Sequence, residues 1–205
     1  MKNMLTPEEQ IEFLAAIEKV KTVATRQLLE RTYPDNVMRI IPQLHHNVDA
    51  LFVQETTTGK EIACRAGCSY CCHVRVEAKP PEIDYIARQL KLLPDAELTH
   101  ILAHMYEGFI EKGRLAVAEP QKRAACVLLE NQQCMIYANR PAVCRKGHST
   151  DAQRCAEGAQ TIPQHLDIIL KAEALIQGVG AAYADVQLSG ESQEFTTALW
   201  DALNI

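Results

Sequence analysis

The sequence has few aromatic residues and no excess of positive charge. Aromatic side chains make up 5% of its 205 residues, which leaves little material for base-stacking surfaces or aromatic cages. Acidic residues outnumber basic ones by 26 to 21, giving a formal net charge of −5. No run of lysine and arginine is long enough to follow a phosphate backbone. We therefore expect no nucleic-acid partner.

Features of membrane insertion and export are also missing. No stretch of about 18 apolar residues occurs, and residues 1–9 become acidic where a signal peptide needs its apolar segment. The sequence contains no phosphate-binding glycine loop, nucleotide-binding fingerprint or nucleophile elbow. We expect a cytoplasmic protein with no membrane span, and the sequence favours a binding protein over an enzyme without deciding between them.

Helical periodicity dominates the rest of the chain. Thr6-Pro7-Glu8-Glu9 has the pattern of a capping box, which predicts a helix start. Residues 126–137 place two short apolar runs around a polar turn, which predicts a β-hairpin. The predicted helices cover residues 6–32, 35–57 with a kink or restart at Pro42, 80–93, 96–117, 161–177 with a break at Gly178 and Gly180, and a segment from 192.

These patterns predict a mainly α-helical fold with a cysteine-rich metal-binding loop and a small β-hairpin. We expect a single domain over residues 1–205. Its parts are a helical N-terminal part at 1–60, a cysteine-cluster core at 61–160 with a helical hairpin inserted, and C-terminal helices at 161–205.

Cysteine is the unusual residue of this chain, with eight copies. A chain of this size with no export signal needs no disulfides, so the thiols are available for metal. Four of them fall in one short loop without apolar periodicity, where Gly67 permits a tight turn. Thiolates select zinc, iron–sulfur clusters or copper(I). The predicted metal ligands are Cys64, Cys68, Cys71, Cys72, Cys126, Cys134, Cys144 and Cys155.

Several alternatives remain open for individual residues. Adjacent Cys71 and Cys72 seldom both chelate one tetrahedral ion, which favours a binuclear site or one ligand beside a reserve thiol. Cys126 and Cys155 also fit buried, unliganded thiols, and an oxidising compartment would allow disulfides.

Other polar residues near the cysteines are candidates for supporting roles. The nearby histidines can ligate directly or bond a thiolate, and the nearby arginines can compensate thiolate charge. These residues are His73, His148, Arg65, Arg140 and Arg145. The remaining row of polar side chains is expected to face water, as is His45; the row consists of His100, His104, Glu107 and Glu111.

The order of the cysteine motifs resembles the YkgJ-type cysteine-cluster family, described as a zinc- or iron-chelating domain. The matching positions are Cys64, Cys68, Cys71, Cys72, Cys126, Cys134, Ile136, Tyr137, Arg140, Pro141, Cys144 and Arg145. The resemblance implies that most of these cysteines bind metal. It implies little more about function, since flagellin lysine methylases are among the few relatives with an assigned activity. Cys155 lies outside the shared pattern, and Lys146-Gly147-His148 stands where the family usually has an aromatic residue and a proline.

We therefore expect a metal-binding protein that chelates zinc or iron, with an iron–sulfur cluster as one form of the centre. One alternative is an iron–sulfur redox enzyme or an S-adenosylmethionine-dependent enzyme, because Cys64-x3-Cys68-x-Tyr70-Cys71 has the spacing of radical enzymes. The helical periodicity on both sides of this motif argues against the strand-rich barrel of such enzymes. A second alternative is a copper(I) or zinc handling protein. Four thiolates suit zinc and iron equally, and no protein partner is indicated.

Overall fold

The computed structural model describes residues 5–57, 59–119, 122–159, 161–188 and 191–204. The chain divides into two compact units. The first, which we call the helical unit, consists of Met1–Glu61 and Gln164–Gly190; the second, the cysteine unit, consists of Ile62–Pro163 and Glu191–Ile205. The single-domain organisation stays a prediction.

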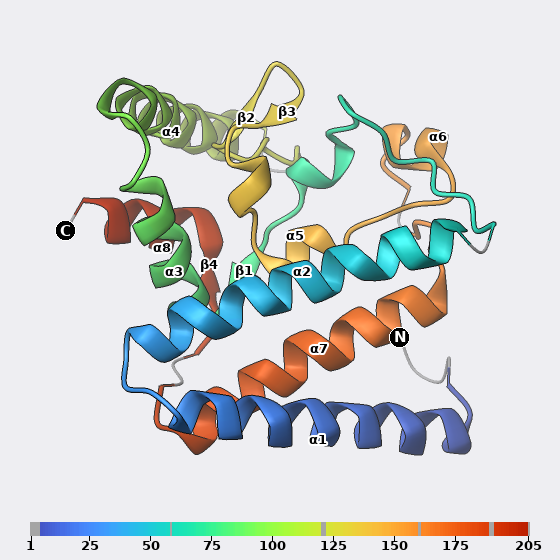
Figure 1. Cartoon of the computed structure of the whole chain (residues 1–205). Coiled ribbons are helices and arrows are strands. Elements are labelled where there is room, and N and C mark those ends of the chain that lie inside the picture. The colour runs from blue at the N-terminus through green and yellow to red at the C-terminus, as the bar shows by residue number, and fades with distance from the viewer. Residues whose placement is uncertain (1–4, 58, 120–121, 160, 189–190, 205) are drawn as a thin grey trace. The chain divides into compact units, whose positions relative to one another are not determined.

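The helical unit contains three long helices, namely α1 (Pro7–Leu29), α2 (Asp35–Thr57) and α7 (Leu166–Asp185). The α1 helix runs alongside α7 (Figure 1). The predicted capping box is present, since Glu9 N–H donates to Thr6 Oγ1 and Thr6 N–H donates to Glu9 Oε2. Buried apolar residues of this unit are Ala24, Leu28, Val37, Ile40, Ile41, Leu44, Val48, Ile168, Ala172, Ala174, Val179, Ala182 and Tyr183.

The α2 helix runs through Pro42 without a restart, which leaves the predicted kink as the alternative. Two other sequence-based expectations for the helical unit are wrong. The α7 helix continues through Gly178 and Gly180. Gly178 is buried, and a Cβ built on it would lie 2.6 Å from Cβ of Val20. This glycine therefore allows close helix packing and does not end the helix. His45 is also buried, not at the surface, because it shares the inner face of α2 with apolar residues.

The cysteine unit is built on α3 (Pro80–Leu90), α4 (Asp95–Ala118) and α8 (Phe195–Leu203). The α3 and α4 helices are the two helices that the sequence predicts here, and α3 packs against α8; their pairing as a hairpin stays a prediction. Strand β1 (Glu77–Ala78) pairs antiparallel with β4 (Gln193–Glu194), a pairing that the sequence does not predict. The core of the unit consists of Ala78, Ile83, Ile86, Ala87, Leu90, Ile101, Met105, Val127, Leu128, Ile136, Phe195, Leu199 and Leu203.

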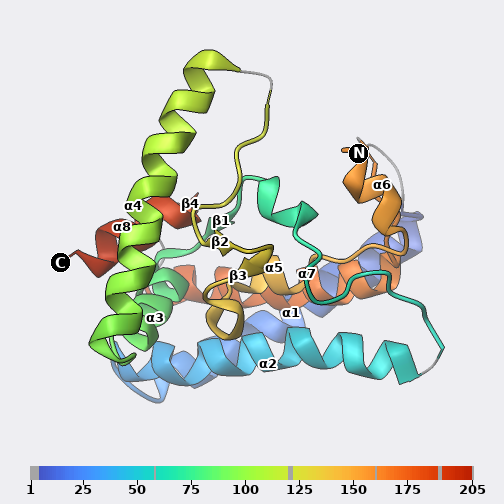
Figure 2. The ribbon, with the colours of Figure 1, turned by 90° about the horizontal axis from the view of Figure 1, so that it is seen from above.

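The predicted β-hairpin is present as β2 (Leu129–Glu130) and β3 (Gln133–Cys134). Its turn residues Asn131 and Gln132 have φ of 48° and 62°, as a two-residue hairpin turn with two left-handed residues requires. The hairpin lies beside α4 (Figure 2), where His104 Nε2 is 3.1 Å from the carbonyl oxygen of Leu129. These features confirm the mainly helical fold with a small hairpin.

Short helices connect the remaining cysteine segments. They are the 3-10 helices η1 (Tyr70–His73) and η2 (Tyr137–Asn139), and the α-helices α5 (Ala142–Arg145) and α6 (Ala152–Ala156). Across the described parts of the chain, no helix is both long enough and apolar enough to cross a membrane.

Candidate metal centre

The cysteine loop takes its shape from short-range main-chain hydrogen bonds. Cys68 N–H donates to the carbonyl of Arg65 at 2.9 Å, and Cys72 N–H donates to the carbonyl of Ser69 at 2.9 Å. Gly67 has φ of +82°, a left-handed conformation that favours glycine. The loop therefore turns before Cys68 and again into η1, which carries Cys71 and Cys72.

The hairpin is attached to this loop through its main chain. The backbone N–H of Cys126 donates a 2.7 Å hydrogen bond to the carbonyl oxygen of Cys72. Cys134 ends β3 and lies opposite Leu129. Both hairpin cysteines pack, partly buried, against the core of the cysteine unit.

Backbone amides point at both hairpin sulfurs. The thiol of Cys126 receives a hydrogen bond from the backbone of Leu128, and that of Cys134 from the backbone of Ile136. In each case the donor comes two residues after the cysteine. Such bonds stabilise a thiolate, and hydrogen bonds to sulfur also tune thiolate-bound iron.

Cys144 comes to the hairpin on the short helix α5. The start of this helix is fixed by the buried carboxylate of Glu82, whose Oε1 accepts a 2.7 Å hydrogen bond from Ala142 N–H. The charges of Cys126 and Cys134 both act on Cys144 and raise its thiol pKa further than burial alone. We define the hairpin set as Cys72, Cys126, Cys134 and Cys144.

Cys155 lies on the other side of the cysteine loop, on α6. The side chain of Asp151 caps this helix by accepting from the N–H groups of Gln153 and Arg154. The α6 helix contacts η1, and the charge of Cys155 acts on Cys64 together with those of Cys68 and Cys71. We define the loop set as Cys64, Cys68, Cys71 and Cys155.

The thiols differ in how readily they ionise. A hydrogen bond from the Cys72 thiol, aided by the charge of Arg140, lowers the pKa of Cys71. The same hydrogen bond raises the pKa of Cys72, because losing its proton would leave two adjacent thiolates. Burial raises the pKa of most of the other thiols, namely Cys64, Cys126, Cys134 and Cys144. Metal binding would therefore have to displace protons from the hairpin set.

All eight cysteines are free thiols. In the segments that the structure describes, no three His, Cys, Asp or Glu side chains converge closely enough to hold a metal ion. The residue types fit zinc or iron, because thiolates are the preferred ligands of both in four-sulfur sites. The two sets thus contain suitable ligand types, and the charge of Cys71 acts on members of both.

The candidate histidines have main-chain partners. His73 Nδ1 lies 3.3 Å from the carbonyl oxygen of Ser69. His148 is buried, and its Nδ1 lies 3.1 Å from the carbonyl oxygen of Lys146. Of the row expected to face water, His100 Nε2 lies 3.0 Å from Glu130 Oε1, and His104 is only partly exposed. The expectation of a solvated row is therefore wrong for His104, because the hairpin covers that part of α4.

Arg140 is the arginine whose charge reaches the thiols. Its guanidinium lies 3.8 Å from the ring centroid of Tyr137, and its Nη1 donates to the carbonyl of the same residue at 2.9 Å. From this position it acts on Cys71 and Cys134. Arg145 is buried and instead donates to the carbonyls of Ala138 and Arg140.

The sequence did not point to the main chain of Ser149. Its N–H hydrogen-bonds the Cys64 thiol, and its carbonyl accepts from Ala63 N–H at 2.9 Å. A backbone contact of this kind does not depend on the type of side chain, so no sequence pattern predicts it. The donors Leu128 and Ile136 follow their cysteines at a fixed spacing, which is the signal that would have found them.

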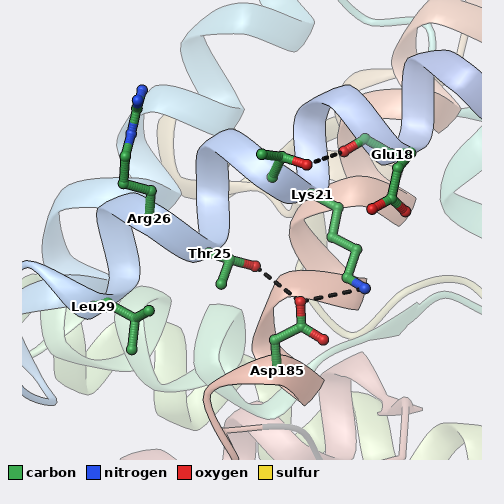
Figure 3. Close-up of a pocket in the computed structure, with 7 residues that line it drawn as sticks. Glu18, Lys21, Thr25, Arg26, Leu29 and Asp185 are labelled. Atoms are coloured by element: carbon green, nitrogen blue, oxygen red, sulfur yellow. Dashed lines mark hydrogen bonds and ion pairs between the residues drawn. The ribbon is translucent and has the colours of Figure 1, made fainter.

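A pocket of about 390 Å³ in the helical unit contains no cysteine (Figure 3). In it, Lys21 Nζ and Thr25 Oγ1 lie 3.3 Å and 3.1 Å from Asp185 Oδ2. Three of its polar side chains thus bond one another, while Thr22 Oγ1 donates to the main-chain carbonyl of Glu18 at 2.9 Å. The lining residues are Glu18, Lys21, Thr22, Thr25, Arg26, Leu29 and Asp185.

Comparison with known proteins identifies one relationship. A family model named CxxCxxCC and described as a putative zinc- or iron-chelating domain matches residues 63–164, about half of the chain. The match contains all eight cysteines, including Cys155, and confirms the resemblance to a cysteine-cluster chelating family. No curated protein matches the chain, and no solved structure matches it.

Proposed function

Because residues 63–164 make this chain a member of the CxxCxxCC family, we propose that it binds zinc or iron through the hairpin set. The ligands are Cys72, Cys126, Cys134 and Cys144. The observation that carries the proposal is the main-chain hydrogen bond between Cys126 N–H and the Cys72 carbonyl, which joins the cysteine loop to the hairpin segment that carries Cys126 and Cys134.

The hairpin set has the number and type of ligands for one closed tetrahedral site. Cys126 and Cys134 each receive a backbone amide hydrogen bond, and Cys144 is held by an α5 helix whose first turn is bonded to Glu82. A metal bound by four thiolates would supply folding energy and cross-link the motifs. To coordinate one ion, the four sulfur atoms must move closer together. The main-chain segments of Cys72 and Cys126 are already joined by their hydrogen bond.

The cytoplasm is the compartment that suits this function. Thiolates ligate metal only while they are reduced, and reducing compartments keep them so. All eight cysteines are free in the structure. We place the protein in the cytoplasm on this basis.

Elemental analysis and absorption spectroscopy of anaerobically purified, untagged protein test the proposal. We expect bound zinc or iron in the wild type and a loss of the hairpin-set metal in the double variant C126S/C144S. The double variant C64S/C155S, which also loses two thiols, is the matched control and should keep the hairpin-set metal. A colourless zinc protein and a brown protein with acid-labile sulfide both support chelation, and the colour identifies which metal chemistry is used.

Unchanged metal content in C126S/C144S would overturn the assignment. A second measurement covers the case in which this variant does not fold. Cobalt(II) replacing zinc in the wild type should give thiolate-to-metal charge-transfer bands and the strong visible bands of a tetrahedral ion. Their absence at full cobalt loading would contradict a four-thiolate site without any substitution.

A further inference from the structure

We propose that α4 is an interaction surface on which a second copy of this chain docks, through antiparallel pairing of the two α4 helices. The surface contains no cysteine, and the inference is independent of the proposed metal site. We call this surface the outer seam. Its residues are Ala103, Tyr106, Ile110, Gly113 and Val117.

Spacing along α4 places the outer seam on one face of the helix. Its members follow one another at alternating intervals of three and four residues, which is the a and d pattern of a coiled coil. The buried residues of α4 are Ile101 and Met105, and at about 100° per residue they lie on the opposite face. The seam therefore points away from the core of the cysteine unit.

Large apolar side chains of the seam are exposed to solvent. The exposed fractions are 58% for Tyr106, 50% for Ile110 and 86% for Val117. The second half of α4 projects past α3 and α8 (Figure 2), whereas both buried residues of the helix, Ile101 and Met105, lie in its first half. Helices in proteins gain most of their stability from packing of an apolar face. A partner on the seam would supply that packing to the second half of α4.

Tyr106 is already held in place for such a contact. Its ring stacks on Trp200 of α8, with the centroids 6.3 Å apart and the planes inclined by 28°. Phe109 packs edge-on against the same indole at 5.7 Å. An aromatic ring that is fixed before association loses less conformational entropy on binding. Tyr106 therefore has the features of an anchor residue in a protein interface.

The charges that flank the seam favour a second copy as its occupant. In an antiparallel pair, the e positions of one helix, which flank its seam, face the e positions of the other. Glu107 and Arg114 occupy two e positions and are exposed. When Ile110 faces Gly113 of the second copy, Glu107 faces Arg114 of that copy, and two-fold symmetry forms this pair twice. Gly113 leaves room for the isoleucine, because nothing lies within 4 Å of a Cβ built on it.

Other alignments of the two helices lack this charge match. Shifting the antiparallel pair by one seam layer in one direction places Glu107 opposite Glu107 of the second copy. A shift in the other direction does the same for Arg114, and like charges in these positions are destabilising. A parallel pair would place Glu107 and Arg114 beside Leu102 and Phe109, which carry no charge. The sequence of α4 thus favours one antiparallel alignment with itself.

The length of the seam predicts a weak dimer. The favoured alignment pairs residues 106–117 of the two copies, a segment of about 18 Å at the rise of an α-helix. An interface of this length is at the small end of those formed between proteins, where complexes are transient. We therefore expect monomer and dimer to exchange, with a dissociation constant in the micromolar range.

Sedimentation equilibrium of the full-length protein tests the proposal, with reductant present to prevent disulfide-linked dimers. We expect the wild type to change from monomer to dimer as its concentration rises. E107R and R114E should each raise the dissociation constant about tenfold or more, because each converts two attractive pairs into repulsive ones. A mixture of the two variants, one of them labelled at its N-terminus, should form a heterodimer with near wild-type affinity, since opposite charges then face each other again.

E111Q is the matched control for the charge variants. Glu111 pairs with Arg114 of the same helix at 3.2 Å, so this variant removes the pair within the helix and leaves the proposed contacts unchanged. We expect it to dimerise like the wild type. I110E, which places a charge in the centre of the seam, should remain monomeric. Circular dichroism checks that each variant keeps its helix content.

Two outcomes would overturn the proposal. One is a wild type that stays monomeric at every concentration, including the case in which the seam binds lipid vesicles or another protein instead. The other is a dimer whose affinity is the same in the wild type, E107R and R114E, because such a dimer uses a different surface. Heterodimer formation by the mixed variants tests the alignment with no need for the single variants to self-associate.

Discussion

The N–H of Cys126 and the carbonyl of Cys72 form a 2.7 Å hydrogen bond that joins the hairpin to the cysteine loop. This bond places two proposed ligands on main-chain segments that are already connected before any metal binds. Loop closure between distant segments costs conformational entropy, and here that cost is met by folding of the cysteine unit. Metal binding then has to order side chains more than main chain.

Arg140 offers a test of how the protein balances the charge of such a centre. Four thiolates around a divalent ion carry a net charge of −2, which a nearby cation stabilises. The guanidinium is held 3.8 Å from the Tyr137 ring centroid, where it acts on Cys71 and Cys134. We expect R140Q to weaken zinc binding by about tenfold or more, the lower end of the range for residues that support metal ligands. Competition with a chromophoric chelator measures the change.

Two control variants separate charge from other effects of this substitution. R114Q removes the same charge from an exposed position on α4 and should leave zinc affinity unchanged. R140K keeps the charge but loses the planar group that stacks on Tyr137, so it should fall between R140Q and the wild type. Equal affinities of R140Q and R114Q would contradict a role for Arg140 in charge balance.

Local sequence patterns predict the helices, the hairpin and the cysteine loop. The capping box at Thr6 and the polar turn at Asn131 and Gln132 each depend on residues a few positions apart, and the structure contains both. The pairing of β1 with β4 could not be predicted in this way, because each strand has only two residues and too few positions to show alternation.

The grouping of the cysteines could not be predicted either. The loop set depends on main-chain bonds of Ser149, and any residue other than proline can make such bonds. Cys155 lies outside the quoted motif order, so its approach to Cys64 follows from tertiary contacts between α6 and η1. Burial of His45 is also tertiary, since its neighbours along α2 include both buried and exposed residues.

An ion network in the helical unit predicts a pH dependence of stability. Glu55 accepts from Lys171 Nζ at 2.6 Å and pairs with Lys60 Nζ at 2.7 Å, and Lys60 also bonds Asp167. The hydrogen bond from Lys171 lowers the pKa of Glu55, and that from Lys60 lowers the pKa of Asp167. Since both carboxyl groups bind protons less readily when folded, they stabilise the fold above their ordinary pKa values of 4.5 and 3.8.

This stabilisation should disappear as the pH falls through the lowered pKa values of the folded protein. We expect E55Q to have a lower thermal midpoint than the wild type near pH 7, and the difference to shrink below about pH 4. Thermal unfolding followed by circular dichroism between these values measures it. E12Q, at an exposed position of α1, is the control and should match the wild type. A difference for E55Q that persists in acid would mean that packing, and not charge, is lost.

Gly178 shows where tertiary packing reverses a local preference. Alanine favours a helix over glycine by about 0.8–1.0 kcal/mol, so propensity alone predicts that G178A stabilises α7. However, the added methyl group would lie 2.6 Å from Val20 Cβ and 2.8 Å from the carbonyl oxygen of Ile17. Overpacking of this kind costs about 1–3 kcal/mol, and we expect G178A to lower the free energy of unfolding by about 1 kcal/mol.

Gly113 provides the matched control for that prediction. It lies inside α4, is exposed, and has nothing within 4 Å of a built Cβ, so G113A should gain up to about 1 kcal/mol. The double variant V20G/G178A tests the contact itself, because glycine at position 20 removes both the Cβ and the Cγ1 atom that lie 2.6 Å from the built methyl group. If the clash with Val20 is the cause, G178A should cost less in the V20G background than in the wild type, as urea unfolding of all four proteins would show. Equal costs in both backgrounds would mean that the α1–α7 contact does not explain why this position is glycine.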